Sequence, residues 1–277
     1  NEFSRLNARI IFLCASTLGT TQIMLNSKSE SFPNGIANSS GVLGHYLMDH
    51  IFESGANGVY PGFQDKYFRG RRPNGIYIPR YHNIDKKDDR FLRGFGFQGG
   101  GKRPGWKRGR AIKGLGVDLK EQLKRPGPWT FSLGGFGEML PDKRNKVWLD
   151  QKQKDKWGIP ILNIECVLRE NELKMLKVMA EDAKEMLEAS GMVDVTTYNN
   201  SAPPGLAIHE MGTARMGRDP NTSVLNKHNQ CHDVPNLFIT DGSCMTSSAC
   251  QNPSLTYMAL TARAADSAVE MLQEGRI

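Results

Sequence analysis

A histidine and an asparagine in the last third of the sequence lie in two segments whose composition suggests chemistry. His209 opens the segment HEMGTARMG at residues 209–217, and Asn252 lies within QNPSLT at residues 251–256. Histidine is the side chain best suited to accept a proton near neutral pH. An asparagine amide can hydrogen-bond a substrate oxygen. Together the two side chains could oxidise an alcohol, if a hydride acceptor lay between them.

Each of these residues also has an ordinary structural interpretation. A lone histidine is more often structural than catalytic, and His228 and His232 lie in the same part of the sequence. Spacing does not choose among the three histidines. Asn252 is a good helix cap, and Pro253 suits the first position of a helix, which we predict to extend over residues 255–272. Because a helix start carries partial positive charge, residues 252–254 could also stabilise an anion.

An apolar run at residues 234–239 predicts a strand that ends just before Asp241 and Gly242. Residues at the end of a strand in an open α/β sheet often contact the hydroxyls or phosphates of a ligand. Asp-Gly is also a common turn, so the pair by itself is a weak signal.

A second candidate ligand segment lies near the N-terminus. Residues 8–13 predict a strand that runs into the small residues Cys14, Ala15 and Ser16 and then into a helix at residues 21–26. Small side chains let a backbone approach a ligand closely. A tight turn without a ligand fits the composition equally well.

The middle of the chain differs from both ends in its composition and in the spacing of its apolar residues. Residues 29–44 are polar and predict a loop, and from residue 55 to 147 short aromatic or β-branched runs alternate with glycine and proline. This predicts an antiparallel sheet with strands at residues 76–78, 129–133 and 146–149. Residues 170–189 predict an amphipathic helix that packs through Leu173, Leu176, Ala180, Ala183 and Leu187 and ends before Gly191.

The segment GFGFQG at residues 94–99 matches the dinucleotide fingerprint G-x-G-x-x-G letter for letter. Those glycines bind a diphosphate only where they connect a strand to a helix N-terminus. No clean strand precedes them, and Gly100, Gly101 and Pro104 follow where a helix should begin. We therefore reject residues 94–99 as a nucleotide site.

The net charge of +7 is concentrated in residues 66–125. Basic residues in this stretch include Arg69, Arg71, Arg72, Lys102, Arg103, Lys107, Arg108 and Arg110. Such a stretch with interleaved aromatic residues could bind nucleic acid. A solvated face is the favoured interpretation, because no nucleic-acid-binding module accompanies the charge.

Composition narrows the remaining classes of protein. The five cysteines form no CxxC pair, which argues against a disulfide scaffold and against a structural zinc site, and Cys231-His232 is only a weak metal signal. His45 and His50, with Asp49 beside the second, favour packing or hydrogen bonding over metal binding, since positions five apart do not share a helix face. The sequence contains no run of 18 apolar residues, so we expect no transmembrane helix.

Taken together, these segments resemble the C-terminal half of the glucose–methanol–choline family of flavin-dependent oxidoreductases. The branch with pyranose oxidases and related bacterial sugar or alcohol dehydrogenases is the most similar, because of residues 209–212 and the Asn252-Pro253 pair. The matching segments follow one another in the family's order and are residues 15–22, 43–50, 209–213, 236–243, 251–256 and 260–272.

The resemblance implies an FAD cofactor and a small alcohol or sugar substrate. His209 would accept the alcohol proton, the hydride would pass to flavin N5, and Asn252 would hydrogen-bond the substrate oxygen. The electron acceptor is left open. The residues beside the flavin would be Cys14, Ala15, Ser16, Asp241, Gly242, Asn252, Pro253 and Ser254. No metal site is expected. The alternatives are a non-catalytic flavoprotein-like module and a nucleic-acid-binding module.

The implied fold is α/β with an α+β insertion. Residues 1–54 and 206–277 would belong to an incomplete Rossmann-like FAD-binding domain, and residues 55–205 to a substrate domain on an antiparallel sheet with helices on one face. The family's N-terminal G-x-G-x-x-G is not in the sequence, which begins at Asn1. We therefore expect a piece of a longer protein that binds FAD poorly and is inactive on its own. Both cytoplasm and periplasm remain open as locations.

Overall fold

The structure of the chain is a computed structural model that describes residues 4–66 and 75–277. It divides into two units, each built from separated stretches of sequence. Unit 1 comprises residues 1–50, 139–168 and 203–277, and unit 2 comprises residues 51–138 and 169–202. Residues 139–168, which lie within the substrate domain expected from the sequence, thus cluster with the stretches that hold His209 and Asn252.

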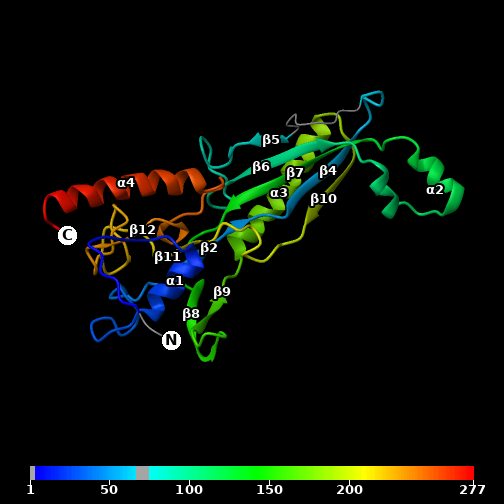
Figure 1. Cartoon of the computed structure of the whole chain (residues 1–277). Coiled ribbons are helices and arrows are strands. Elements are labelled where there is room, and N and C mark those ends of the chain that lie inside the picture. Colours follow the sequence, from blue (N-terminus) through cyan, green and yellow to red (C-terminus); the bar gives the residue numbers. More distant parts are fainter. Residues whose placement is uncertain (1–3, 67–74) are drawn as a thin grey trace. The chain divides into compact units, whose positions relative to one another are not determined.

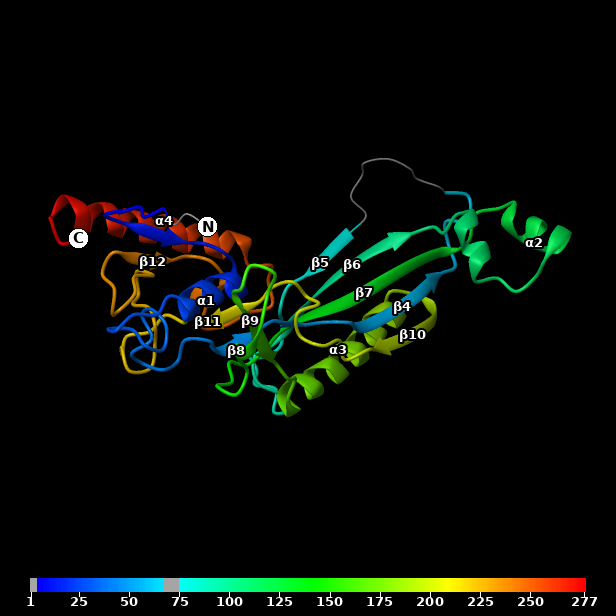
Figure 2. The same ribbon diagram turned by 60° about the horizontal axis from the view of Figure 1, so that its bottom comes forward.

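Unit 2 is an antiparallel sheet with one long helix, α3 (Glu170–Ala189), packed on one face (Figures 1 and 2). The strand order is β10-β4-β7-β6-β5. The strands are β4 (Ser54–Tyr60), β5 (Gly75–Ile78), β6 (Phe95–Lys102), β7 (Trp129–Glu138) and β10 (Val193–Asn199). The mixed α/β class is confirmed, and so are the antiparallel strands predicted at residues 76–78 and 129–133. The prediction that residues 146–149 belong to the same sheet is wrong, because they lie in β8 (Lys146–Lys154), which pairs in a separate sheet of unit 1.

Two glycines of β7 allow α3 to approach the sheet closely. A Cβ at Gly137 would lie 2.5 Å from Cε of Met179 and 2.7 Å from Sδ of Met175, and one at Gly135 would lie 2.7 Å from Sδ of Met179. Both methionines are fully buried. The predicted helix at residues 170–189 has the expected bounds. The prediction that Leu173 packs in the core is wrong, because 49% of that residue is exposed.

The glycine-rich segment 94–99 lies almost entirely in β6, which pairs with β5 on one side and β7 on the other. A strand in the middle of a sheet presents no helix N-terminus to a diphosphate, so the rejection of the fingerprint at residues 94–99 is confirmed.

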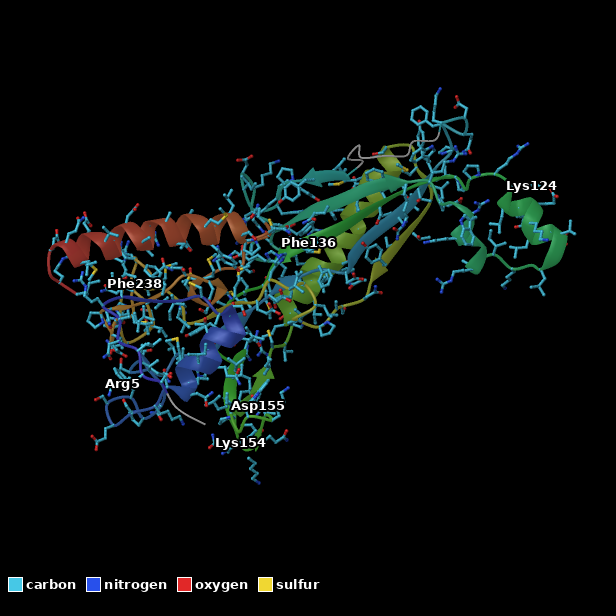
Figure 3. The ribbon with its side chains drawn as sticks, viewed as in Figure 1. Arg5, Lys124, Phe136, Lys154, Asp155 and Phe238 are labelled. Atoms are coloured by element: carbon cyan, nitrogen blue, oxygen red, sulfur yellow. The ribbon has the colours of Figure 1, made fainter. Side chains whose placement is uncertain are left out.

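Between β6 and β7 the chain leaves the sheet as the 3-10 helix η1 (Trp106–Arg110) and the helix α2 (Gly116–Leu123) (Figure 1). The guanidinium of Arg108 closes this excursion by donating to the carbonyls of Gln122 and Arg125. Lys124, labelled in Figure 3, directly follows α2. Arg69, Arg71 and Arg72 of the basic stretch lie outside the described residues.

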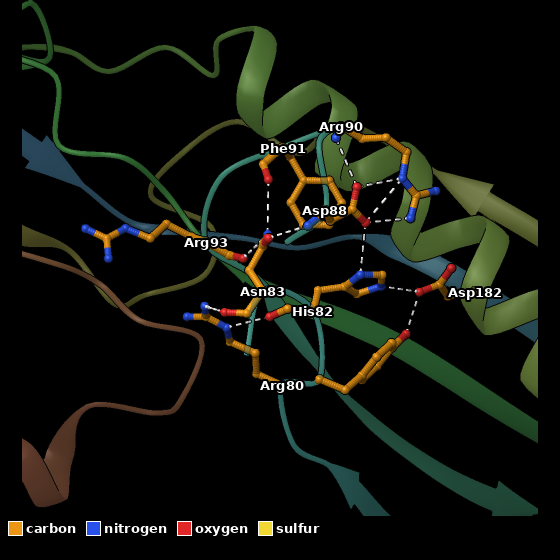
Figure 4. A network of polar contacts seen from close by, with 9 residues as sticks. Arg80, His82, Asn83, Asp88, Arg90, Phe91, Arg93 and Asp182 are labelled. Carbon is orange, nitrogen blue, oxygen red and sulfur yellow. Dashed lines mark hydrogen bonds and ion pairs between the residues drawn. The ribbon is translucent and has the colours of Figure 1, made fainter. Parts of the chain in front are cut away.

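A polar network ties the loop after β5 to α3 (Figure 4). The imidazole of His82 lies between two carboxylates, with Nδ1 at 3.1 Å from Asp88 and Nε2 at 2.7 Å from Asp182. The Tyr81 hydroxyl also donates to Asp182 at 2.5 Å. Asp88, whose side chain is 12% exposed, accepts from the guanidinium of Arg90. These hydrogen bonds lower the pKa of Asp88 from 3.8 to about 2.

The depressed pKa of Asp88 predicts a pH-dependent contribution to stability. Since the unfolded state binds the proton more readily, the contribution is present above pH 3.8 and is lost as the pH falls toward about 2. We expect the gap in thermal unfolding temperature between the wild type and Asp88→Asn to narrow between pH 5 and pH 2.5. The exposed neighbour Asp89 supplies the control Asp89→Asn. A gap that stays constant over this range would contradict the prediction.

Unit 1 contains a parallel pair of short strands, β1 (Ile11–Leu13) and β12 (Leu237–Ile239). The helix α4 (Ser254–Gln273) covers this pair, because Phe238 of β12 forms one buried cluster with Ala264 and Ala268 of α4. Figure 3 labels Phe238. Phe12 stacks on Phe238 with ring centroids 5.2 Å apart. The strands predicted at residues 8–13 and 234–239 are confirmed, although both are shorter than predicted.

A second sheet in unit 1 has the order β11-β2-β8-β9. Its strands are β2 (His45–Met48), β8 (Lys146–Lys154), β9 (Pro160–Glu165) and β11 (Met211–Thr213). The helix α1 (Thr17–Asn26) joins this sheet through buried threonines, since Oγ1 of Thr21 donates to Oγ1 of Thr213 at 2.7 Å. The short strand β3 (His50–Ile51) lies at the sequence boundary of the two units, and the 3-10 helix η2 (Gly242–Cys244) follows β12.

The two helices next to the predicted site begin at positions that differ from the predictions. The helix predicted at residues 21–26 already begins at Thr17, because the N–H of Thr20 donates to the carbonyl of Ser16. Pro253 occupies the cap position of α4, and Ser254 is its first helical residue. The prediction that Asn252 is the cap is therefore off by one residue. No helix among the described residues is both long and apolar enough to span a membrane.

Candidate functional site

Residues from four separated parts of unit 1 line one cavity of about 330 Å³. The lining residues are Cys14, Ser16, Thr17, Ile208, His209, Glu210, Asp241, Gly242, Pro253, Ser254 and Tyr257. Most of the residues predicted from the sequence thus meet at one place. Ala15 and Asn252 are not among the lining residues, although each directly adjoins one that is.

Two helices begin at this cavity. Ser16 precedes α1 and Pro253 precedes α4, and neither residue caps its helix through a side-chain hydrogen bond. The first turn of each helix also lacks an acidic residue. Unpaired N–H groups and the helix dipole make a helix start electropositive. Two such starts at one cavity favour an anionic or electron-rich ligand.

The turn before α1 is held by Asp241. The N–H of Ala15 donates to Oγ1 of Thr20 at 3.1 Å, and this hydroxyl donates to Oδ2 of Asp241 at 2.5 Å. Oδ1 of Asp241 accepts from the N–H and the hydroxyl of Ser243. Both carboxylate oxygens therefore have protein partners, and Asp241 joins the end of β12 to α1.

Gly242 lies where several segments meet. A Cβ at this position would lie 2.5 Å from the carbonyl oxygen of Glu210, 2.5 Å from Oγ1 of Thr17 and 3.0 Å from the hydroxyl of Tyr257. These distances are too short for any side chain, so the cavity wall requires glycine here. Burial raises the pKa of Tyr257, which keeps its phenol protonated at neutral pH.

The buried carboxylate of Asp49 holds the segment that carries His209. Oδ2 of Asp49 accepts from the N–H groups of Gly205 at 2.6 Å and Ala207 at 3.3 Å. Oδ1 accepts from the N–H groups of His209 at 3.1 Å and His50 at 2.8 Å. Asp49 is 1% exposed, so these charge-assisted bonds form away from water. They fix the backbone of residues 205–209 next to residues 49 and 50.

Ile208, between two of these donors, has a φ of 58°. A β-branched residue in the left-handed region costs of order 1–3 kcal/mol and persists only where its surroundings enforce it. Asp49 supplies that constraint by binding the N–H groups on either side, at residues 207 and 209. The side chain of Ile208 is 77% exposed and lines the cavity.

The side chain of His209 contacts a second histidine. Its Nδ1 lies 3.0 Å from Nδ1 of His50, and the two rings meet edge to face with centroids 4.8 Å apart. Nε2 of His50 lies 3.0 Å from the carbonyl oxygen of Ser248. Burial is the main cause that lowers the pKa of His50, and the neighbouring His209 lowers it further.

The remaining candidate histidines have other surroundings. His228 and His232 are absent from the cavity wall, and Nε2 of His232 lies 3.0 Å from the hydroxyl of Ser223. Nδ1 of His45 lies 2.8 Å from the carbonyl oxygen of Lys143. Within residues 4–66 and 75–277, no group of three or more His, Cys, Asp or Glu is placed to hold a metal ion. Of the candidate histidines near residue 209, the structure thus places only His209 at this cavity.

Several residues of the site are missing from the sequence predictions. Thr17 and Glu210 are direct neighbours of predicted residues, and Tyr257 lies one helical turn after Ser254, so sequence proximity could have found them. Asp49 and His50 are a different case. They lie far from residue 209 in the sequence, and only the fold brings them together.

Asp49→Asn tests whether this carboxylate organises the site. Asparagine would place an N–H₂ group opposite backbone N–H donors, which leaves buried donors unpaired. We expect the free energy of unfolding, measured in urea, to fall by about 2–4 kcal/mol. Asp65→Asn is the control, because the Asp65 side chain is 74% exposed and should change stability little. Equal stability of the two variants would refute the assigned role.

Comparison with known proteins places this architecture in a family. A profile described as GMC oxidoreductase matches residues 141–261. A 2-methyl-1,2-propanediol dehydrogenase from Mycolicibacterium austroafricanum is 34% identical over 94% of this chain and 48% of that protein. A fructose dehydrogenase large subunit from Gluconobacter japonicus is 26% identical over 98% of this chain and 49% of that protein. The chain thus spans about half the length of these relatives.

The fold is also found in a solved structure. A formate oxidase variant from Aspergillus oryzae RIB40, solved to study the effect of a mutation on FAD modification, matches with a TM-score of 0.61 at 14% identity. The match covers 96% of this chain and 55% of that one, and at this identity it shows the fold alone. With the match at residues 141–261 and the similarity to the two dehydrogenases, the chain belongs to the GMC (glucose–methanol–choline) family of oxidoreductases.

Proposed function

We propose that this chain is the C-terminal part of an FAD-dependent oxidoreductase that oxidises a CH–OH group of a sugar or another small alcohol. One observation carries the proposal: a histidine and the N-termini of two helices line the same cavity. The relatives described above include one dehydrogenase named for a diol and one named for a sugar. Their names support the substrate class without selecting a substrate.

The residues of the cavity fit a flavin ring. The electropositive starts of α1 and α4 suit the electron-rich pyrimidine end of a reduced flavin. The small residues Cys14 and Ser16 and the side-chain-free Gly242 leave the backbone accessible to a flat group. Residues Ala15, Asp241, Asn252, Pro253 and Ser254 complete the proposed cofactor-binding set, with Asp241 in a positioning role.

The proposed chemistry divides between cofactor and protein. When bound, FAD supplies the hydride acceptor at N5. His209 accepts the hydroxyl proton of the alcohol, for which its place at the cavity wall and its firmly held backbone are suited. Asn252, next to Pro253, hydrogen-bonds the substrate oxygen and orients the reacting carbon. Proton removal at the oxygen is what makes loss of hydride from the carbon favourable.

We further propose that residues 1–54 and 206–277 belong to a Rossmann-like FAD-binding domain and residues 55–205 to the substrate domain. The parallel pair β1 and β12 with its covering helix α4 supports the first assignment. The antiparallel sheet with α3 supports the second for residues 55–138 and 169–202, whereas residues 139–168 cluster with unit 1. A nucleic-acid-binding module is not favoured, because both relatives named above are dehydrogenases and the solved structure with this fold is an oxidase.

Removal of the proposed base provides the direct test. In the full-length, FAD-loaded protein, His209→Ala should slow flavin reduction by substrate by about 10²–10⁴-fold, since a general base is lost. The visible flavin spectrum before substrate addition should stay unchanged. His232→Ala is the matched control, because His232 does not line the cavity. Normal flavin reduction in His209→Ala, followed by stopped-flow absorbance, would refute the assignment.

A second test concerns the 277-residue chain by itself. Because the chain spans about half the length of its relatives, we expect it to retain little FAD after desalting and to oxidise no alcohol. Flavin absorbance per protein measures this directly. Stoichiometric yellow flavin on the isolated chain would contradict the expectation.

A further inference from the structure

The pair of histidines determines where protons lie in the site. Nε2 of His50 is 3.0 Å from the carbonyl oxygen of Ser248. A carbonyl oxygen only accepts hydrogen bonds, so Nε2 of His50 carries a proton. His50 is 2% exposed, and its lowered pKa keeps the ring neutral near pH 7. A neutral imidazole has one N–H, so Nδ1 of His50 carries a lone pair.

This arrangement dictates the protonation of His209. Nδ1 of His209 lies 3.0 Å from the lone pair on Nδ1 of His50, so it must donate its proton there. In neutral His209 the second nitrogen, Nε2, then has no proton. The hydrogen bonds form a directed chain from His209 through His50 to the carbonyl of Ser248.

We propose that His50 is a positioning residue for His209: by accepting a hydrogen bond from Nδ1–H, it selects the tautomer whose Nε2 lone pair takes the alcohol proton. This assignment rests on the proposed function of His209. It differs from the usual arrangement, in which a carboxylate or a backbone carbonyl orients a functional histidine. Here the nearby carboxylate, Asp49, accepts from the backbone N–H groups of both histidines, and the imidazole of His209 contacts that of His50.

A neutral acceptor also determines where the proton stays after transfer. Once Nε2 of His209 is protonated, its ring is a cation that still donates through Nδ1 to His50. Onward transfer to His50 would place the charge on a more deeply buried ring whose Nε2–H is already committed to Ser248. Burial disfavours such a charge. The proton therefore remains on His209, from where it can return to the cavity and to solvent.

The tautomer itself can be measured independently of activity. In the full-length protein labelled with ¹⁵N-histidine, two-bond ¹⁵N–¹H correlation spectra distinguish Nδ1–H from Nε2–H rings, and His209→Ala identifies the signals of His209. We expect the Nδ1–H form for His209 and the Nε2–H form for His50 in the wild type. The Nε2–H form at His209 would overturn the inference, whatever the activity of the enzyme.

Substitution of His50 tests the consequence for the reaction. His50→Phe keeps an aromatic ring but removes the acceptor. We expect flavin reduction to slow by about 10- to 100-fold, by analogy with the loss of a partner that orients a metal-bound histidine. His50→Asn restores an acceptor near the position of Nδ1 and should recover most of the rate. His45→Phe is the matched control, because the ring of His45 bonds to the carbonyl of Lys143 and not to His209.

The outcomes separate the two proposals. An unchanged rate in His50→Phe, with an intact flavin spectrum, would overturn the role of His50 while leaving that of His209 in place. Normal flavin reduction in His209→Ala would overturn the proposed base, and the tautomers in the spectra would still report the hydrogen-bond chain. If His50→Phe fails to fold, the wild-type spectrum alone decides.

Discussion

The geometry of the site depends on one buried negative charge. Asp49 is almost fully removed from water, and its carboxylate is compensated by backbone N–H groups from residues 50, 205, 207 and 209. Burying a carboxylate without hydrogen-bond partners costs more free energy than the fold can supply. Residues 205–209 must therefore lie against residues 49 and 50 for Asp49 to be buried. The same hydrogen bonds hold Ile208 in the left-handed backbone conformation, which is unfavourable for a β-branched residue. The hydrogen bonds to Asp49 thus fix the backbone at His209 in spite of the strain at Ile208.

The charges around the cavity follow a consistent pattern. Asp241 is the wall carboxylate that could be predicted from the sequence, and its oxygens are bound by Thr20 and Ser243. The starts of α1 and α4 add positive potential without any ionised side chain. The histidine that contacts His209 is kept neutral by burial. A site of this kind stabilises negative charge on a ligand.

Sequence reasoning predicted the local elements and their chemistry better than their assembly. The helix at residues 170–189 has an unbroken apolar period, so its bounds could be read from the sequence. The lining residues Cys14, Ser16, Asp241, Gly242, Pro253 and Ser254 follow or precede strands and helices whose ends leave local signals in the sequence. His209 was selected by the resemblance to the family, because spacing did not choose among the three histidines of that region. The segment that contains α2 is rich in glycine, as its flanking strands are, and periodicity did not separate the helix from them.

Asp49 and His50 show where this reasoning stops. Their neighbours in sequence suggested hydrogen bonding or packing, and that is what the structure shows, but the partners lie at residues 205–209 and 248. A carboxylate bound by backbone N–H groups has no signature in the partner sequence, because every residue except proline carries the donor. The hydrogen-bond partners of such a carboxylate can therefore be identified only from the three-dimensional structure.

The pairing of β1 with β12 has a consequence for biosynthesis. Ile11 and Leu237 are neighbours in a parallel ladder although nearly the whole chain separates them, and unit 2 is made from two stretches that interrupt unit 1. Contacts so distant in sequence form late, because a long loop must close before they contribute. On the ribosome, the antiparallel sheet and α3 can form before residues 203–277, which pack with residues 1–50, have been synthesised. During this interval Phe12 lacks the ring of Phe238 on which it stacks. Unit 1, which contains the candidate site, therefore keeps apolar surface exposed for longer than unit 2 during synthesis, and exposed apolar surface promotes aggregation.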